Sequence, residues 1–248
     1  MSGHSKWATI KHKKGALDAK RGAIFTKIIK EITVAARNGG GNPESNPRLR
    51  TALAKAKESN MPADNIERAI KKGTGELPGV SYEEQSYEGY GSGGAAILIE
   101  VLTDNKNRTT SEIRNILEKK GGSMSGAGSV AWQFHKKGLI LVKKTAAEED
   151  KLMGLALDSG ASDFTAEKDS YEIITEPQDF ESVKKAIMDA KIPTESAEIT
   201  RIPSATVKLG LSDAKTVLAL IEALEDHDDV QNVYSNIDVS DEVLQQLG

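Results

Sequence analysis

The chain has 248 residues, 38% of them apolar and 28% charged, a composition typical of a folded protein with one large domain or two to three small ones. It contains no cysteine, which excludes disulfides, thiolate metal ligands and cysteine nucleophiles. Its 33 Lys and Arg residues and 37 Asp and Glu residues give a formal net charge of −4. As an average, this value argues against a polyanionic partner.

The charge is unevenly distributed along the chain. Residues 1–75 hold 16 basic and six acidic residues, whereas residues 76–248 hold 17 basic and 31 acidic ones. The first thirty residues alone contain eight basic residues and one acidic residue. The near-neutral total is therefore the difference between a basic and an acidic part, which predicts a polyanionic partner at the N-terminal end.

No apolar run is long enough to cross a membrane, and the N-terminus lacks the apolar core of a secretory signal. A lysine-rich, acid-poor start is also compatible with an organelle transit peptide. Transit peptides favour Arg and Ser, however, and this segment carries Trp7 and a Lys-His-Lys-Lys run. We therefore expect a cytoplasmic protein without membrane contact, and a monomer.

Helical periodicity dominates residues 17–72. Ile24, Ile28 and Ile32 recur one turn apart and predict an amphipathic helix that ends near Asn38-Gly39. Asn46-Pro47 provides an N-cap followed by proline at the first helical position, and Met61-Pro62 opens a third helix. The segment predicts a small helical domain.

Two mixed segments follow a composition change at residues 73–79. The first is interrupted and combines strands at 95–103, 129–134, 205–209 and 230–235 with helices at 109–120 and from Ser212 onward. Between its halves, strands at 138–143, 163–166, 171–175 and 198–202 alternate with helices at 148–157 and 180–190. This second pattern has the βαββαβ order of the ferredoxin-like unit.

We therefore predict an α+β protein with an N-terminal helical domain and two mixed α/β domains of ferredoxin-like order, one inserted in the other. The predicted boundaries are 1–76 for the basic helical domain, 77–134 plus 204–248 for the acidic host domain, and 135–203 for the insert. Together with Glu76, the host carries seven basic and 17 acidic residues, so it is the most acidic part of the chain.

Two motifs suggest chemistry but have simpler explanations. Residues 89–94 match G-x-G-x-x-G, yet they precede a strand instead of joining a strand to a helix, which favours a glycine-rich turn over a dinucleotide site. His227, Asp228 and Asp229 offer metal ligands, but adjacent residues between a helix and a strand usually point in different directions, which favours a solvated turn. We predict no catalytic residue, no cofactor and no metal.

The N-terminal basic cluster is the sharpest functional signal. Its lysines and arginine can neutralise phosphates, and Trp7 and His12 can stack on bases, although a solvated tail with Trp7 packed on the helical domain is the alternative. Lys20, Lys27 and Lys30 lie off the isoleucine stripe and leave a second helix face for phosphate. Arg108, near a predicted helix N-terminus, is a secondary phosphate contact, or part of a structural turn capped by Thr109 or Thr110. The predicted nucleic-acid-binding set is Lys6, Trp7, Lys11, His12, Lys13, Lys14, Lys20, Arg21 and Lys27.

Sequence blocks along the whole chain resemble the YebC/PmpR family. These blocks include Gly3-His4-Ser5-Lys6-Trp7, Asp18-Ala-Lys20-Arg21-Gly22, Asn46-Pro47-Arg48-Leu49-Arg50, Asn60-Met61-Pro62, Tyr87-Glu-Gly-Tyr-Gly91, Asp104-Asn105 with Asn107-Arg108-Thr109, and Glu225-Asp226-His227-Asp228-Asp229-Val230-Gln231. The resemblance implies three domains and no enzymatic activity. It also implies DNA-binding transcriptional regulators among bacterial members, and a translational activator as the mitochondrial relative. Because the chain starts directly at the first of these blocks, we expect a bacterial cytosolic member.

The expected function is that of a non-enzymatic nucleic-acid-binding regulator of gene expression. The resemblance favours a DNA-binding transcriptional regulator. The alternative is a ribosome-associated factor or translational activator that binds ribosomal RNA. No evident base-reading set of Arg, Asn and Gln supports a helix-turn-helix, so the residues themselves lean slightly toward RNA.

Overall fold

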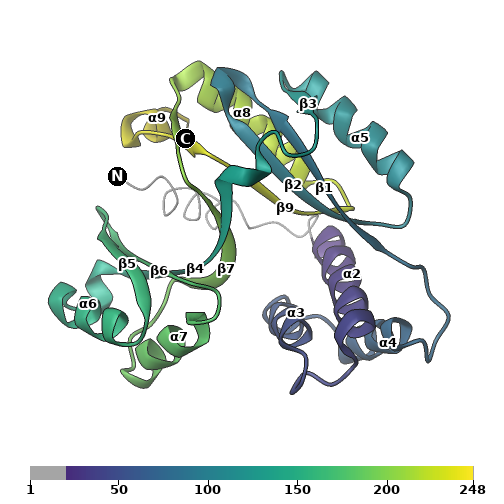
Figure 1. Cartoon of the computed structure of the whole chain (residues 1–248), viewed down its shortest axis with the longest axis horizontal. Helices are drawn as coiled ribbons and strands as arrows, with labels where there is room; N and C mark the ends of the chain where they lie inside the picture. Colours follow the sequence, from purple (N-terminus) through teal and green to yellow (C-terminus); the bar gives the residue numbers. More distant parts are fainter. Residues whose placement is uncertain (1–20, 248) are drawn as a thin grey trace.

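The computed structural model describes residues 21–247 and has the predicted α+β architecture. A helical domain is followed by two mixed domains, each built on a four-stranded antiparallel sheet, and the second is inserted in the first. Figure 1 shows the helical domain and the insert at two separate ends of the middle domain.

The helical domain consists of α2 (Arg21–Gly39), α3 (Pro47–Glu58) and α4 (Ala63–Thr74). Ile28 and Ile32 of the predicted stripe are buried in its core, whereas Ile24 is exposed. Asn46 caps α3 as predicted, because its side-chain oxygen accepts a hydrogen bond from the Leu49 N–H at 3.1 Å. Its amide group also donates to the carbonyl oxygens of Ala35 and Gly40, so the cap ties α3 to the end of α2.

The middle domain has the sheet order β3-β1-β2-β9, and every neighbouring pair is antiparallel. The strands are β1 (Glu83–Tyr90), β2 (Ala96–Thr103), β3 (Ser123–Ser125) and β9 (Val230–Ser235). Helices α5 (Lys106–Lys119) and α8 (Leu211–Glu225) share one apolar cluster with the inward face of β2. A short parallel pair, β8 (Val207–Lys208) and β10 (Ile237–Asp238), and helix α9 (Asp241–Leu247) complete the domain.

Two predicted strands of the middle domain are wrong. Residues 129–133 form a loop and the 3-10 turn η3 (Ala131–Gln133), because the buried Glu88 carboxylate holds the loop backbone in a non-extended shape, and Phe134 begins the first strand of the insert. Residues 205–209 contribute only the two-residue β8. Their places in the main sheet are taken by β3 and β1, which the sequence did not predict. The central strand β1 comes before β2 in the chain, so the expected succession of two βαβ units is also wrong for this domain.

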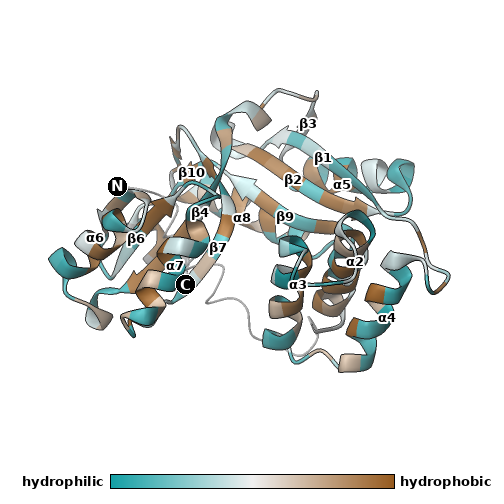
Figure 2. Ribbon diagram, turned by 60° about the horizontal axis from the view of Figure 1, so that its bottom comes forward, coloured by the Kyte–Doolittle hydropathy of each residue, from teal (hydrophilic) through white to brown (hydrophobic). Residues whose placement is uncertain are grey.

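The insert has the predicted ferredoxin-like order. It consists of β4 (Phe134–Lys143), α6 (Glu149–Asp158), β5 (Ala161–Ala166), β6 (Ser170–Thr175), α7 (Phe180–Asp189) and β7 (Ser196–Pro203). Its sheet runs β5-β6-β4-β7 with antiparallel neighbours, and both helices pack on the same face. Figure 2 shows hydrophobic and hydrophilic residues alternating along the helices, and the buried residues of α6 and α7 form one apolar cluster with the insert sheet.

Three separate apolar clusters correspond to the three parts of the chain. The clusters lie within residues 28–69, 87–239 without the insert, and 140–192. This separation supports the proposed boundaries at 76/77, 134/135 and 203/204, which stay a prediction. None of the described helices is long and apolar enough to cross a membrane.

The close packing of α4 on α2 generates a stability prediction. A Cβ atom on Gly73 would lie 2.4 Å from the Thr33 carbonyl oxygen and 2.7 Å from the Ala36 Cβ, so Gly73→Ala forces the two helices apart. We expect a loss of about 1–3 kcal/mol in unfolding free energy, measured by chemical denaturation with circular dichroism. Gly154→Ala on α6 is the control, because a Cβ there meets nothing within 4 Å. Equal denaturation curves for the two variants would contradict this packing.

Candidate nucleic-acid interface

Most of the predicted binding set lies outside the described residues. Lys6, Trp7, Lys11, His12, Lys13, Lys14 and Lys20 precede residue 21, and only the backbone of Arg21, at the start of α2, is described. Lys27 and Arg108 are the two members that the structure places. Both lie where the helical and middle domains meet.

The lysines on the second face of α2 point toward the middle domain. Lys27 Nζ donates a hydrogen bond to the backbone carbonyl of Glu225, at the C-terminal end of α8. Lys30 Nζ donates to the Asp228 carbonyl at 3.0 Å and lies 2.5 Å from Asp229 Oδ1. A helix C-terminus presents unsatisfied carbonyls and partial negative charge, which suits a lysine. Because Lys30 is 7% exposed, the prediction that it faces phosphate is wrong.

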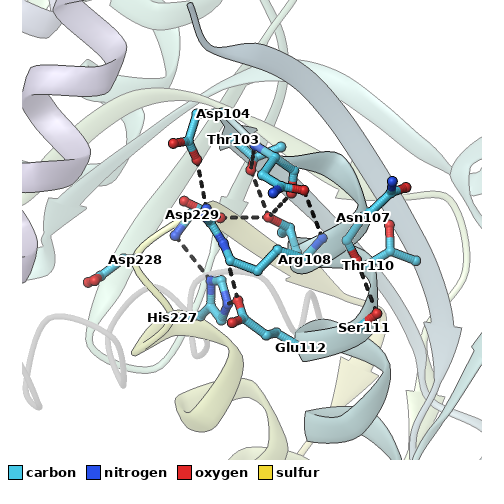
Figure 3. Close-up of polar contacts among 12 residues, drawn as sticks. Thr103, Asp104, Asn107, Arg108, Thr110, Ser111, Glu112, His227, Asp228 and Asp229 are labelled. Atoms are coloured by element: carbon cyan, nitrogen blue, oxygen red, sulfur yellow. Dashed lines mark hydrogen bonds and ion pairs between the residues drawn. The ribbon is translucent and has the colours of Figure 1, made fainter. Parts of the chain in front are cut away.

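The Asp229 carboxylate is the centre of a buried polar cluster (Figure 3). One of its oxygens accepts from Lys30, and the other accepts from Thr109 Oγ1 at 2.6 Å and Arg108 Nη2 at 2.9 Å. Burial alone would raise the pKa of Asp229, but the hydrogen bonds from Lys30, Thr109 and Arg108 outweigh it and hold that pKa well below its usual range. The carboxylate is therefore ionised and links segments from both domains.

Arg108 is surrounded by carboxylates. In addition to Asp229, it pairs with Asp104 at 2.7 Å, and its Nε lies 3.9 Å from Glu112 Oε2. The helix that carries it begins earlier than predicted, and Asn105, rather than Thr109 or Thr110, provides the N-cap. A phosphate at Arg108 would compete with these acids for the guanidinium, so the secondary phosphate contact stays a prediction with strong local competition.

The same cluster contains a possible metal-ligand set, because ligand atoms of Glu112, His227 and Asp229 lie within 4.8 Å of one another. The hydrogen bonds give these atoms other roles. His227 Nδ1 accepts from the Asp229 N–H, which places the proton of a neutral ring on Nε2, 2.8 Å from Glu112. A metal would have to displace Lys30 or Arg108 from Asp229. The absence of a metal stays a prediction. The prediction that residues 227–229 form a solvated turn is wrong for Asp229, whose side chain is buried, with 3% of the residue exposed.

Further polar contacts join the helical domain to the segment that leads into β1. Arg37 donates to Ser81 Oγ and to the Tyr82 carbonyl, both at 2.7 Å. Arg48 pairs with Glu31 at 2.7 Å and with Glu84 at 2.6 Å. Both arginines are thus engaged within the chain, and the charge of Arg48 is neutralised by carboxylates.

Apart from Arg37, the basic side chains of the helical domain that remain exposed without an ion pair among the described residues lie on α3 and, with Arg68 and Lys72, on α4. Arg50, Lys55 and Lys57 are exposed, and none of them forms an ion pair with another residue in the range 21–247. Arg50 and Lys57 are seven positions apart and flank the buried stripe of Leu49 and Ala56 on one side, and Lys55 flanks it on the other. The sequence carried this signal as four basic residues and no acid between residues 47 and 57, but we had not singled it out.

Comparison with known proteins assigns the chain to a class. The model of the TACO1/YebC N-terminal domain matches residues 5–76, and the model of the TACO1/YebC second and third domain matches residues 82–237. Together they cover most of the chain and both mixed domains. The chain belongs to the TACO1/YebC family.

Full-length relatives support the same assignment. The chain is 60% identical over 247 residues to a "Probable transcriptional regulatory protein" of Desulforapulum autotrophicum, with all of both chains covered. It is 58% identical to a protein of the same description from Geobacter sulfurreducens, again with all of both chains covered. A crystal structure of a conserved hypothetical protein from Aquifex aeolicus, 46% identical, superposes with a TM-score of 0.83 over 97% of this chain and 99% of that one.

The Asp229 cluster generates the second prediction. Lys30→Met removes one partner of a buried ion pair and leaves a carboxylate that is only partly compensated, so we expect a loss on the order of 3 kcal/mol in unfolding free energy. The measurement is denaturation at neutral pH. Lys71→Met is the control, since it removes only the exposed Lys71–Glu67 pair and should change the unfolding free energy much less than Lys30→Met does.

The pH dependence tests the same cluster. Because the folded-state pKa of Asp229 is depressed, its contribution to stability is present above the unfolded pKa of about 4 and is lost as the pH falls through the folded value. Asp229→Asn should therefore be less stable than the wild type at neutral pH, and the difference should shrink in acid. A difference that is constant from neutral to strongly acidic pH would rule out an ionised Asp229.

Proposed function

We propose that this protein is a non-enzymatic regulator of gene expression that binds nucleic acid through the helical domain and the segment that precedes it. The observation that carries the proposal is the set of exposed basic side chains on α3 that form no ion pair among the described residues, together with the lysine-rich sequence of residues 1–20. The described relatives are named as probable transcriptional regulators, which supports a role in regulation. On that basis the first candidate target is DNA, in the cytoplasm.

The proposed interface recognises the nucleic-acid backbone. Cations neutralise phosphates and release counterions regardless of sequence, whereas base reading in the major groove typically uses Asn and Gln alongside Arg. Helix α3, with the sequence PRLRTALAKAKE, has no Asn or Gln. The cations of α3 are therefore suited to sequence-independent contacts, and any selectivity must come from the shape of the target or from another part of the protein.

RNA is the second candidate target, and the same observation supports it. A surface that grips phosphates without reading a groove can bind structured ribosomal RNA as well as duplex DNA. We propose translation-related binding at the ribosome as the alternative to transcriptional regulation. Crosslinking in cells, followed by sequencing of bound DNA and bound RNA, distinguishes them: promoter enrichment supports the first and ribosomal RNA enrichment the second.

The interface generates a binding prediction. The triple charge reversal Arg50→Glu, Lys55→Glu and Lys57→Glu should weaken binding to duplex DNA and to structured RNA by at least about tenfold. It should also flatten the salt dependence, because each lost phosphate contact changes the slope of log K against log salt by about 0.7–0.9. Fluorescence anisotropy over a range of salt concentrations measures both effects. Reversal of Lys11, Lys13 and Lys14 should act in the same direction.

The matched control reverses charges on the insert. Lys151 and Lys185 are exposed on α6 and α7, and their reversal changes the net charge without touching the proposed interface. It should leave the salt slope unchanged. If neither the α3 variant nor the Lys11, Lys13 and Lys14 variant changed the salt slope, the proposed interface would be wrong. If the wild type turned over a nucleotide or nucleic acid, with or without divalent metal, the non-enzymatic assignment would be wrong.

A further inference from the structure

Trp132 is the most exposed large apolar side chain among residues 21–247, with 69% of its surface accessible. It lies in η3, at the junction of the middle domain and the insert. Exposure of an indole is unfavourable in water unless a partner covers it at least part of the time. The structure around Trp132 indicates that this exposure is built in.

A buried carboxylate fixes the loop that carries Trp132. Glu88, 5% exposed, accepts hydrogen bonds from the backbone N–H groups of Gly128 and Val130 at 2.6 Å and of Ala131 at 2.8 Å. Burial alone would raise the pKa of Glu88, but these N–H donors outweigh it and lower that pKa, so the carboxylate stays ionised. A buried charge with three backbone donors holds the loop in one shape.

The indole itself is also held in place. Trp132 Nε1 donates to the Ser129 carbonyl at 3.1 Å, and the Tyr90 hydroxyl donates to the same oxygen at 3.2 Å. Two aromatic side chains, one 69% and the other 38% exposed, therefore lie on either side of one fixed carbonyl. An aromatic surface fixed before binding loses little conformational freedom when a ligand covers it.

The chain around Trp132 is basic although the surrounding domain is acidic. Residues 119–147 contain six lysines and no Asp or Glu. Lys119, Lys120 and Lys136 are exposed and form no ion pair within the described range, whereas Lys137 is paired with Glu176. Lys119 and Lys120 end α5, which packs on the face of the sheet opposite Tyr90, whereas Lys136 follows Trp132 by four residues in the chain.

We propose that Trp132 and Tyr90 form a stacking site for an unpaired base of single-stranded nucleic acid, with the exposed Lys136, four residues beyond Trp132 in the chain, contacting a neighbouring phosphate. This inference rests on the proposed function and specifies the ligand class of a second contact, far from α3 in sequence. Exposed aromatic side chains flanked by cations are the general means of holding single strands, because every base offers a π face. Bases in a duplex are stacked on one another and cannot cover an indole.

The test is binding of the full-length protein to labelled oligo(dT) and oligo(U), with a duplex of equal length as a second probe. Trp132→Ala should weaken single-strand binding by about tenfold and leave duplex binding within about twofold, because only the stacked base is lost. Trp132→Phe should recover most of the affinity. In a Trp7→Phe background, where Trp132 is the only tryptophan, the single strands should quench its fluorescence.

Met188→Ala is the matched control, since Met188 is 61% exposed on α7 and lies outside the basic segment. Unchanged single-strand affinity in Trp132→Ala, an equal loss on the duplex, or unquenched Trp132 fluorescence would each overturn the stacking site. If the wild type binds none of the probes, the proposed function itself fails. If α3 charge reversal abolishes binding but Trp132→Ala does not change it, only the stacking site fails.

Discussion

The arrangement of the helical domain on the middle domain depends on the buried Asp229 carboxylate. Lys30, Arg108 and Thr109 donate to its two oxygens from α2 and from the start of α5, so three distant segments of the chain meet at one charge. A buried carboxylate is costly to desolvate, and only a complete set of donors offsets that cost. The cluster forms only when both domains are in register, which makes it a determinant of their relative orientation.

The orientation of the helical domain on the middle domain determines which basic side chains remain available to bind phosphate. Lys27 and Lys30 face the C-terminal end of α8, and Arg37 and Arg48 bind the segment between Ser81 and Glu84. The acidic character of the middle domain thus has an intramolecular partner, and the charge asymmetry of the sequence serves in part to hold the domains together. Of the cations of α3, Arg48 has such acidic partners, whereas Arg50, Lys55 and Lys57 form no ion pair among the described residues and are exposed to solvent.

Sequence reasoning was reliable where the determinants are local. The isoleucine stripe of α2, the Asn46-Pro47 start of α3 and the βαββαβ order of the insert depend on residues a few positions apart, and all are present in the structure. Strand β1 was missed because its sequence, EEQSYEGY, is polar and its burial comes from neighbouring strands. The role of Asp229 could not be predicted either, because its donors lie about 120 and 199 positions away.

The apolar sequence at Val130–Phe134 shows how one distant residue overrides local preference. Its residue types favour a strand, and on that basis we predicted one. Instead, the Glu88 carboxylate on β1 accepts hydrogen bonds from the backbone N–H groups of Gly128, Val130 and Ala131. In a strand, such N–H groups would donate to a neighbouring strand. At Asp229 and at Glu88 alike, a buried acid recruits donors from a remote segment. At Asp229 these donors are side-chain cations and a hydroxyl, so the result is a joint between domains. At Glu88 they are backbone amides, so the result is a rigid loop, and the tryptophan that follows is held at the surface instead of being drawn into the core.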